Sequence, residues 1–208
     1  GYDGKGQFVL RSEDQIDTAW AELGPAKSLI AESFVKFSRE VSIIAVRGQD
    51  GDVKTWALAE NHHHNGILSH SIVPAPNSTD LQPVAQDYIT RLLNHLNYVG
   101  VLTLELFVTE QGLYANEMAC RVHNSGHWSI EGAICSQFEN HIRAVAGLPL
   151  GATDVVRPTV MINIIGQHPK SEDVLALKGA HLHLYNKSER AGRKLGHITL
   201  MPNDRDDL

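Results

Sequence analysis

The sequence predicts an α+β protein, in which an antiparallel sheet with helices over residues 1–150 is followed by a small β-rich domain over residues 151–208. Turn residues at 48–51 and 110–112 each separate two apolar, β-branched segments, which is typical of hairpins and predicts the sheet. Apolar residues at helical spacing between these hairpins predict the helices. Beyond about residue 150 the pattern changes to short strands, which predicts the second domain.

The composition is that of a globular protein of one to two domains, with 208 residues, 42% hydrophobic and 20% charged. No apolar run approaches a membrane span and no leader opens the chain, so we expect no membrane partner. A net charge of −6 argues against nucleic-acid binding through a broad basic face but leaves a local phosphate pocket open. Two cysteines without an export signal favour a cytoplasmic location.

The first quarter of the chain predicts one helix and two strands. Residues 12–24 predict the helix, because Ser12 begins a capping-box pattern and apolar residues follow at helical spacing up to a Gly-Pro stop. Apolar and β-branched residues at 29–37 and 40–46 predict the strands.

The next segments predict a strand, a loop and the strongest helix of the chain. Residues 53–59 follow the 48–51 turn and complete a hairpin. Residues 60–79 have poor periodicity, contain two prolines and predict a long exposed loop, a kind of segment that is often functional. Apolar residues on one helical face predict a helix over 81–96.

The remaining elements are a hairpin, a helix and three strands. Strands are predicted over 99–108 and 113–118, joined by a three-residue loop, and a helix is predicted over about 131–146, closed by Gly147. The predicted strands of the β-rich domain cover residues 160–165, 180–185 and 196–201.

The 99–118 hairpin brings two carboxylates together. If residues 110–112 form the loop, the register places Glu105 opposite Glu117. Like charges across a ladder destabilise it, so a compensating cation is expected, and oxygen ligands of this kind suit Mg²⁺. The alternative is a solvated pair on an edge hairpin.

Polar residues crowd the segment that follows, residues 116–128, in which eight of thirteen side chains can donate or accept hydrogen bonds. Arg121 is the residue best suited to bind an anion, and His123 and Asn124 are best suited to form hydrogen bonds with a polar ligand. A surface cation is the alternative for Arg121 alone, but within this cluster a binding site is favoured.

Three further segments are weaker candidates. Residues 1–7 contain three glycines and suit phosphate binding by backbone amides, although they lack the Walker spacing and a flexible turn is the alternative. The consecutive histidines at 62–64 cannot surround one tetrahedral ion, which favours His63 as a lining residue over a zinc ligand. Residues 187–197 carry four cations and one acid, which indicates a pocket for an anionic ligand, with a solvated basic turn as the alternative.

Four motifs of this chain resemble one enzyme family. They are Gly-Tyr-Asp-Gly-Lys-Gly-Gln at 1–7, Glu-Asn-x-His-x-x-Gly-Ile at 60–67, Asn-Glu-Met-Ala-x-Arg-x-His-Asn-Ser-Gly-His-Trp at 116–128 and Gly-Arg-Lys-x-Gly-His-Ile at 192–198. Their order and spacing resemble the N5-carboxyaminoimidazole ribonucleotide synthetases, ATP-grasp enzymes of purine biosynthesis. The resemblance implies an ATP-grasp fold over residues 1–150 and a homodimeric, cytoplasmic ligase.

The resemblance also implies a reaction and its residues. ATP and bicarbonate would form carboxyphosphate, which carboxylates 5-aminoimidazole ribonucleotide. The implied catalytic residues are Arg121, His123 and Asn124, and the implied Mg²⁺ ligands are Glu105 and Glu117. ATP would be bound by Gly4, Lys5, Gly6, Gln7, Glu32, Val35, Glu40 and Asn116. The ribonucleotide would be bound by His63, His123, Asn124, Ser125, Lys187, Arg190, Arg193 and Lys194.

Two departures from the family pattern limit these expectations. Cys120 stands where the family usually has proline, which removes no ligand. The family's N-terminal domain and its ATP-phosphate lysine have no counterpart in this chain, so we expect a missing N-terminal part of the same enzyme and an inactive fragment without it. Another ATP-grasp ligase with a different acceptor and a non-catalytic phosphate-binding module are the alternative functions.

Overall fold

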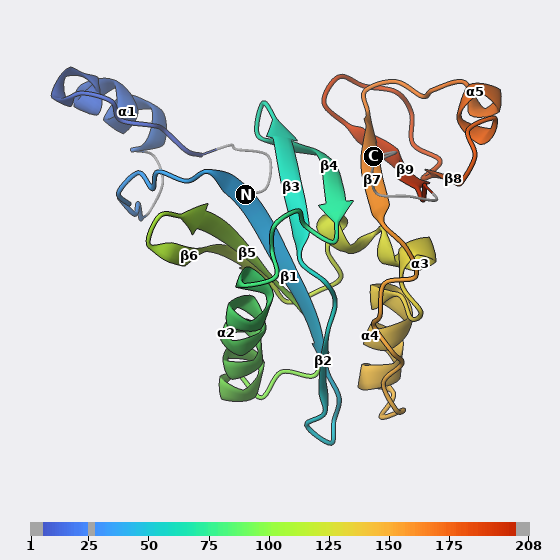
Figure 1. Cartoon of the computed structure of the whole chain (residues 1–208). Coiled ribbons are helices and arrows are strands. Elements are labelled where there is room, and N and C mark those ends of the chain that lie inside the picture. The colour runs from blue at the N-terminus through green and yellow to red at the C-terminus, as the bar shows by residue number, and fades with distance from the viewer. Residues whose placement is uncertain (1–5, 25–27, 203–208) are drawn as a thin grey trace.

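The structure is a computed structural model that describes residues 6–24 and 28–202. Its centre is a nine-stranded antiparallel sheet in the order β6-β5-β1-β3-β4-β7-β9-β8, with β2 paired to β1 (Figure 1). The strands are β1 Arg39–Arg47, β2 Val53–Thr55, β3 Ala59–His64, β4 Ile67–Val73, β5 Gly100–Thr109, β6 Gly112–Ala119, β7 Thr159–Ile165, β8 Ala180–Leu184 and β9 Lys194–Leu200.

Five α-helices and two 3₁₀ turns occupy the described residues. They are η1 Glu13–Gln15, α1 Ile16–Leu23, α2 Leu81–His95, η2 Asn124–Gly126, α3 Ser129–Gly132, α4 Gln137–Val145 and α5 Ser171–Leu175. Helix α1 has no buried residue and stands away from the sheet (Figure 1). None of the described helices is both long and apolar enough to cross a bilayer.

Strand β1 is buried on both faces because helices pack on each side of it. Val41, Ile43 and Ala45 pack in one apolar cluster with α2, and the alternate residues Ile44 and Val46 pack in a second cluster with residues of α4 and the segment before it. Figure 1 shows α2 and α4 on opposite sides of β1. The even-numbered face of β1 is therefore the one that the 121–137 segment covers.

Two predicted elements are wrong in the first half of the chain. Residues 29–37 form no strand, and no described strand pairs with them. Their apolar and β-branched residues favour a strand, but a strand also needs a neighbouring strand to pair with. Residues 60–79 are not a long loop, because β3 and β4 form a hairpin there. Its turn is Asn65-Gly66, and both residues have a positive φ. The Asn-Gly dipeptide is typical of a hairpin turn, but the preceding residues are polar histidines without the apolar alternation expected of a strand, so the hairpin was not predicted.

The predicted helix over 131–146 is two helices. Helix α3 ends at Gly132, and α4 begins after Ser136, whose side chain accepts a hydrogen bond from the backbone N–H of Glu139 at 3.1 Å. This Ser-x-x-Glu pattern is a helix start in the sequence. The helices predicted over 12–24 and 81–96 and the strands predicted over 40–46, 99–108 and 113–118 are confirmed, whereas the strand predicted over 53–59 is shorter and ends at Thr55.

The C-terminal strands continue the same sheet. Strand β7 pairs with β4 from Val73↔Thr159 to His70↔Ile162, and β9 and β8 follow it. The three strands predicted beyond residue 150 are confirmed, and β9 starts two residues earlier than predicted, which places Lys194 on the strand. This pairing brings the C-terminal basic segment beside the rest of the sheet.

Candidate active site

The register of the β5–β6 hairpin places Glu105 opposite Glu117, as predicted, so both residues lie on one face of the ladder. The turn is shorter than predicted, since Thr109 pairs with Gly112 rather than with residue 113. A β-bulge between Glu105 and Leu106 shifts the register by one residue and restores the predicted pair. Asn116 is the extra residue of that bulge, and bulges of this kind re-aim side chains beside active sites.

Glu105 forms the best-defined charged contact of this face. Its Oε1 lies 3.0 Å from Nε2 of His123, and its side chain is only a fifth exposed. Burial acts to raise the pKa of the Glu105 carboxyl, but the hydrogen bond from His123 and the charges of His63 and Arg121 outweigh it and lower the pKa. Glu105 is therefore an ionised carboxylate at neutral pH, as a Mg²⁺ ligand has to be.

Gln137 holds the backbone of His123 in place. Its side-chain oxygen accepts from the His123 N–H at 2.9 Å, and its side-chain nitrogen donates to the His123 carbonyl at 2.7 Å. Gln137 is fully buried at the start of α4. Sequence reasoning missed this residue, since a glutamine on a helix carries no local signal for such a role.

Glu40 and His63 meet on neighbouring strands β1 and β3. His63 Nδ1 lies 3.3 Å from Glu40 Oε2, and this hydrogen bond raises the pKa of His63 despite burial. Glu105 adds to the same rise, which places three of the predicted site residues within electrostatic reach of one another. The strand that carries His63 was predicted as a loop, yet the residue lies beside the site.

The C-terminal basic segment reaches the 121–128 segment through Lys194, whose ammonium donates to Oδ1 of Asn124. Lys187 and Lys194 each lie 5.5 Å from the ring centroid of Tyr185. Burial and the charge of Lys187 lower the pKa of Lys194 to about 7. Because the charge of Lys187 disfavours a charged Lys194, a bound anion near both groups would offset this repulsion.

A group of aromatic and imidazole side chains lies under this cation pair. Tyr185 O–H lies 2.6 Å from Nδ1 of His197, and His197 stacks on His183 at 4.3 Å between ring centroids. Burial lowers the pKa of His127 to about 4, and the charge of Lys194 contributes, so His127 is neutral. Sequence reasoning missed this group, although alternating histidines at 181, 183 and 197 could have indicated one sheet face.

Other predicted site residues are not brought into this cluster. Glu32 is exposed and Val35 half-buried in the segment before β1, and Gly6 and Gln7 are exposed. Arg121, by contrast, lies within electrostatic reach of the cluster, since its charge helps to lower the pKa of Glu105; its exposed side chain donates to the carbonyl of Val122 at 3.1 Å. Gly4 and Lys5 lie outside the described residues.

The remaining predicted residues lie at the edges of the site. Arg193 donates to the side chain of Ser188 at 3.0 Å, within its own loop, and Arg190 is exposed. Ser125 is fully buried, and Asn116 is exposed on β6. Among the described residues, no group of three or more acidic, histidine or cysteine side chains could hold a metal ion by itself, so any cation here would need ligands besides Glu105 and Glu117.

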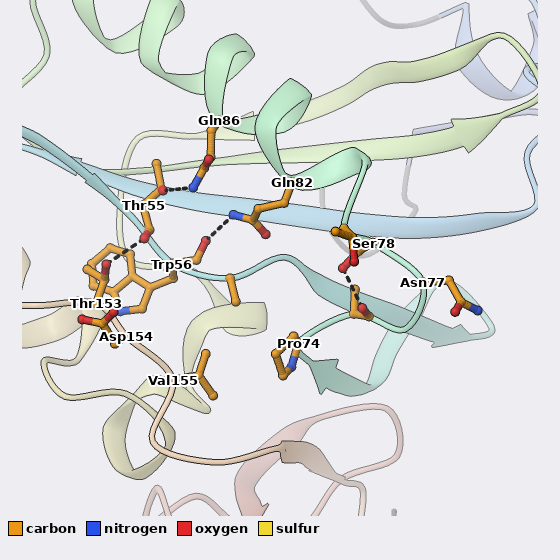
Figure 2. Close-up of a pocket in the computed structure, with 13 residues that line it drawn as sticks. Thr55, Trp56, Pro74, Asn77, Ser78, Gln82, Gln86, Thr153, Asp154 and Val155 are labelled. Carbon is orange, nitrogen blue, oxygen red and sulfur yellow. Dashed lines mark hydrogen bonds between the residues drawn. The ribbon is translucent and has the colours of Figure 1, made fainter. Parts of the chain in front are cut away.

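A pocket of about 390 Å³ lies elsewhere, between β2, α2 and residues 153–155 (Figure 2). None of the predicted site residues lines it. Its polar groups bond within the chain, since Gln86 donates to the Thr55 hydroxyl at 2.7 Å and Thr153 donates to the Thr55 carbonyl at 2.7 Å. The first bond joins α2 to β2 and the second joins residues 153–155 to β2, which gives the lining a structural role.

The sequence matches the ATP-grasp domain family over residues 1–138, which include the Glu105, His123 and His63 cluster. The chain belongs to the ATP-grasp family. Residues 159–208 match a second family, described as the phosphoribosylaminoimidazole carboxylase C-terminal domain. The two matches meet in the structure where Asn124 contacts Lys194.

Individual relatives carry the name N5-carboxyaminoimidazole ribonucleotide synthase. The chain is 52% identical to that of Pseudomonas aeruginosa, with 100% of this chain and 57% of the relative covered, and 50% identical to that of Vibrio parahaemolyticus, with 96% and 54% covered. The chain spans about half the length of the curated relatives it matches.

Solved structures agree with this similarity. The N5-carboxyaminoimidazole ribonucleotide synthetase of Thermus thermophilus matches with a TM-score of 0.93 and 51% identity, over 97% of this chain and 56% of its own. The synthase of Aspergillus clavatus in complex with ADP and 5-aminoimidazole ribonucleotide matches with a TM-score of 0.88 and 31% identity, over 96% and 56%. The family resemblance inferred from the four motifs is thereby confirmed.

Proposed function

We propose that this chain supplies part of the active site of an enzyme that carboxylates 5-aminoimidazole ribonucleotide with ATP and bicarbonate, giving N5-carboxyaminoimidazole ribonucleotide for purine biosynthesis. The contact between Asn124 and Lys194 carries the proposal, because it joins the two most family-specific motifs in one site. The names of the relatives, and the ribonucleotide in one of their structures, support it.

The acidic end of the site is the proposed nucleotide and cation end. Glu105 and Glu117, with Asn116 beside them, would hold Mg²⁺, and the register and the lowered pKa of Glu105 support this. Bound there, Mg²⁺ would neutralise phosphate charge during phosphoryl transfer. Glu40 would bind the ribose hydroxyls, while Gly4, Lys5, Gly6 and Gln7 would bind the phosphates and Glu32 and Val35 would bind the adenine.

The basic end of the site is the proposed end for the ribonucleotide. Lys187, Arg190, Arg193 and Lys194 would bind its phosphate, and the spacing of both lysine ammonium groups from Tyr185 supports this. His63, Asn124 and Ser125 would approach the aminoimidazole.

Arg121 and His123 lie between the two ends in the chain and are the proposed reaction centre. A guanidinium stabilises carboxyphosphate and the negative charge that develops during its formation. We therefore propose that Arg121 binds bicarbonate and carboxyphosphate, while His123 and Asn124 orient the acceptor amine.

We also propose an assembly, a cellular location and partners for the enzyme. The chain would act together with an N-terminal part of the same protein, as a homodimer in the cytoplasm, with small molecules and no nucleic acid or membrane as partners. The net charge of −6 supports the exclusion of nucleic acid.

Turnover by the complete gene product tests this function. We expect ADP release that requires both bicarbonate and 5-aminoimidazole ribonucleotide, with formation of the N5-carboxylated product. ADP release with a different acceptor would identify another ATP-grasp ligase, and nucleotide binding without ADP release would identify a non-catalytic module. Either result contradicts the proposal.

A further inference from the structure

A row of buried polar side chains crosses the sheet beneath the 121–128 segment. Ser42 on β1, Asn61 on β3 and Ser71 on β4 are all buried. Their even-numbered neighbours on β1, Ile44 and Val46, are apolar and pack in the core of the same face. Buried polar groups cost stability unless they are hydrogen-bonded, so a polar row within an apolar face calls for an explanation.

These side chains form one continuous chain of hydrogen bonds that ends at Glu105. Ser71 Oγ donates to Asn61 Oδ1 at 2.8 Å, and Asn61 Nδ2 donates to Ser42 Oγ at 3.0 Å. Ser42 Oγ donates to Ser125 Oγ at 2.8 Å. The Ser125 hydroxyl lies 2.9 Å from Nδ1 of His123, whose Nε2 lies 3.0 Å from the Glu105 carboxylate.

The direction of this chain is set at the His123 end by a backbone donor, and the Asn61 end is consistent with it. The backbone N–H of Ser125 also points at Nδ1 of His123, at 3.3 Å, and a backbone N–H can only donate. Nδ1 is therefore an acceptor, and the proton of the neutral ring is on Nε2, where the Glu105 carboxylate accepts it. At the other end the amide nitrogen of Asn61 can only donate, so the hydroxyls of Ser42 and Ser125 each accept one hydrogen bond and donate the next.

We propose that Ser42 and Asn61 are positioning residues for the reaction centre. Acting through Ser125, they hold the His123 ring in the orientation and tautomer that donates to Glu105. They touch neither substrate nor cation, since both lie beneath the segment that carries His123. The kinetic consequence rests on the proposed function, whereas the tautomer of His123 does not.

A purely structural role for the row would make a different prediction. In that case any buried hydroxyl of the same sheet face would be equivalent, and its loss would lower stability without affecting His123. Thr103 provides the matched control, because it is fully buried on β5, two residues before Glu105, and its hydroxyl has no hydrogen-bond partner among the described residues. Thr103→Val preserves its shape and leaves the row intact.

The experiment compares Ser42→Ala, Asn61→Leu and Thr103→Val in the complete gene product. Long-range ¹H–¹⁵N spectra of ¹⁵N-histidine-labelled protein report the tautomer, and His123→Gln identifies the His123 signals. We expect one tautomer in the unmodified protein, with the proton on Nε2, and mixed tautomers in the Ser42 and Asn61 variants. Loss of one link should lower kcat about tenfold with the KM for ATP changed less than about twofold, whereas Thr103→Val should change neither.

Several outcomes overturn the proposal. One is an unmodified protein whose His123 lacks the single Nε2–H tautomer, and another is an unchanged tautomer in both Ser42→Ala and Asn61→Leu. A loss of kcat in Thr103→Val equal to that in Ser42→Ala would also overturn it. If the unmodified protein shows no turnover with 5-aminoimidazole ribonucleotide, the proposed function fails, and the spectra still decide the positioning role.

Discussion

Gln137→Leu tests whether the His123 backbone is held by a single buried side chain. Leucine has a similar size but cannot bond the His123 N–H and carbonyl, which lie 2.9 and 2.7 Å from the Gln137 side chain. An unsatisfied buried polar group costs about 1–3 kcal/mol. Because the segment can relax towards solvent, we expect the free energy of unfolding to fall by about 2–4 kcal/mol rather than by the full sum for two groups.

Thermal unfolding followed by tryptophan fluorescence measures this loss, since Trp56 and Trp128 are both fully buried. At roughly 2–4 °C per kcal/mol for a domain of this size, the midpoint should fall by about 5–15 °C. In the complete gene product kcat should also fall, because His123 is no longer fixed relative to Glu105. An unchanged midpoint would refute the assignment of these two hydrogen bonds.

Gln82→Leu is the matched control for Gln137→Leu. The Gln82 side chain makes the same pair of backbone bonds, accepting from the Leu58 N–H at 2.8 Å and donating to the Trp56 carbonyl at 3.2 Å, but it lies beside the pocket of Figure 2. Its loss should lower the unfolding midpoint without changing kcat. An equal fall of kcat in both variants would mean that the effect on activity is global destabilisation.

Three further predictions concern charged groups of the site. Replacing Glu105 or Glu117 with glutamine should reduce ATP turnover by orders of magnitude while circular dichroism stays unchanged, and near-normal turnover in either variant would contradict a shared cation site. Lys194→Met should raise the KM for 5-aminoimidazole ribonucleotide about ten- to a hundredfold with little change for ATP. The same variant should be more stable than the unmodified protein near pH 7, because the folded state holds the pKa of Lys194 down to about 7, and its advantage should disappear as pH approaches the ordinary lysine pKa near 10.5. The His63–Glu40 pair raises the pKa of His63, so its stabilisation is present below about pH 6.5 and lost as pH rises through the raised pKa; His63→Gln should remove that dependence in urea titrations.

The β5–β6 hairpin shows how far the sequence could predict this site. The facing pair of Glu105 and Glu117 is confirmed, but the assumed three-residue loop is wrong, and a bulge at Asn116 compensates for the error. The glycine signal is local, since Gly112 has a positive φ, but it indicates where the hairpin turns and not the length of the loop. A bulge depends on how two strands pack over their whole length, so nothing local in the sequence predicted it.

The contacts between distant segments mark the limit of sequence reasoning. The composition of residues 116–128 and 187–197 predicted two polar segments, and only the sheet order β4-β7-β9-β8 brings Lys194 to Asn124. The polar row of Ser42, Asn61 and Ser71 was missed for the same reason, because each serine or asparagine alone is an ordinary strand residue. Strand register places the three side chains within hydrogen-bond distance of one another, and a single sequence does not specify that register.

The two faces of β1 explain how the fold stays stable although it buries polar groups at this site. Val41, Ile43 and Ala45 bury apolar surface against α2, and this face supplies hydrophobic stabilisation without any polar group to satisfy. The opposite face carries Ser42 next to the apolar Ile44 and Val46 and lies against the 121–137 segment, where each hydrogen bond contributes only about 0.5–1.5 kcal/mol net. Because alternate residues of one strand serve the two faces, the fold can retain a polar reaction centre on one side while the other side holds the sheet to its helix.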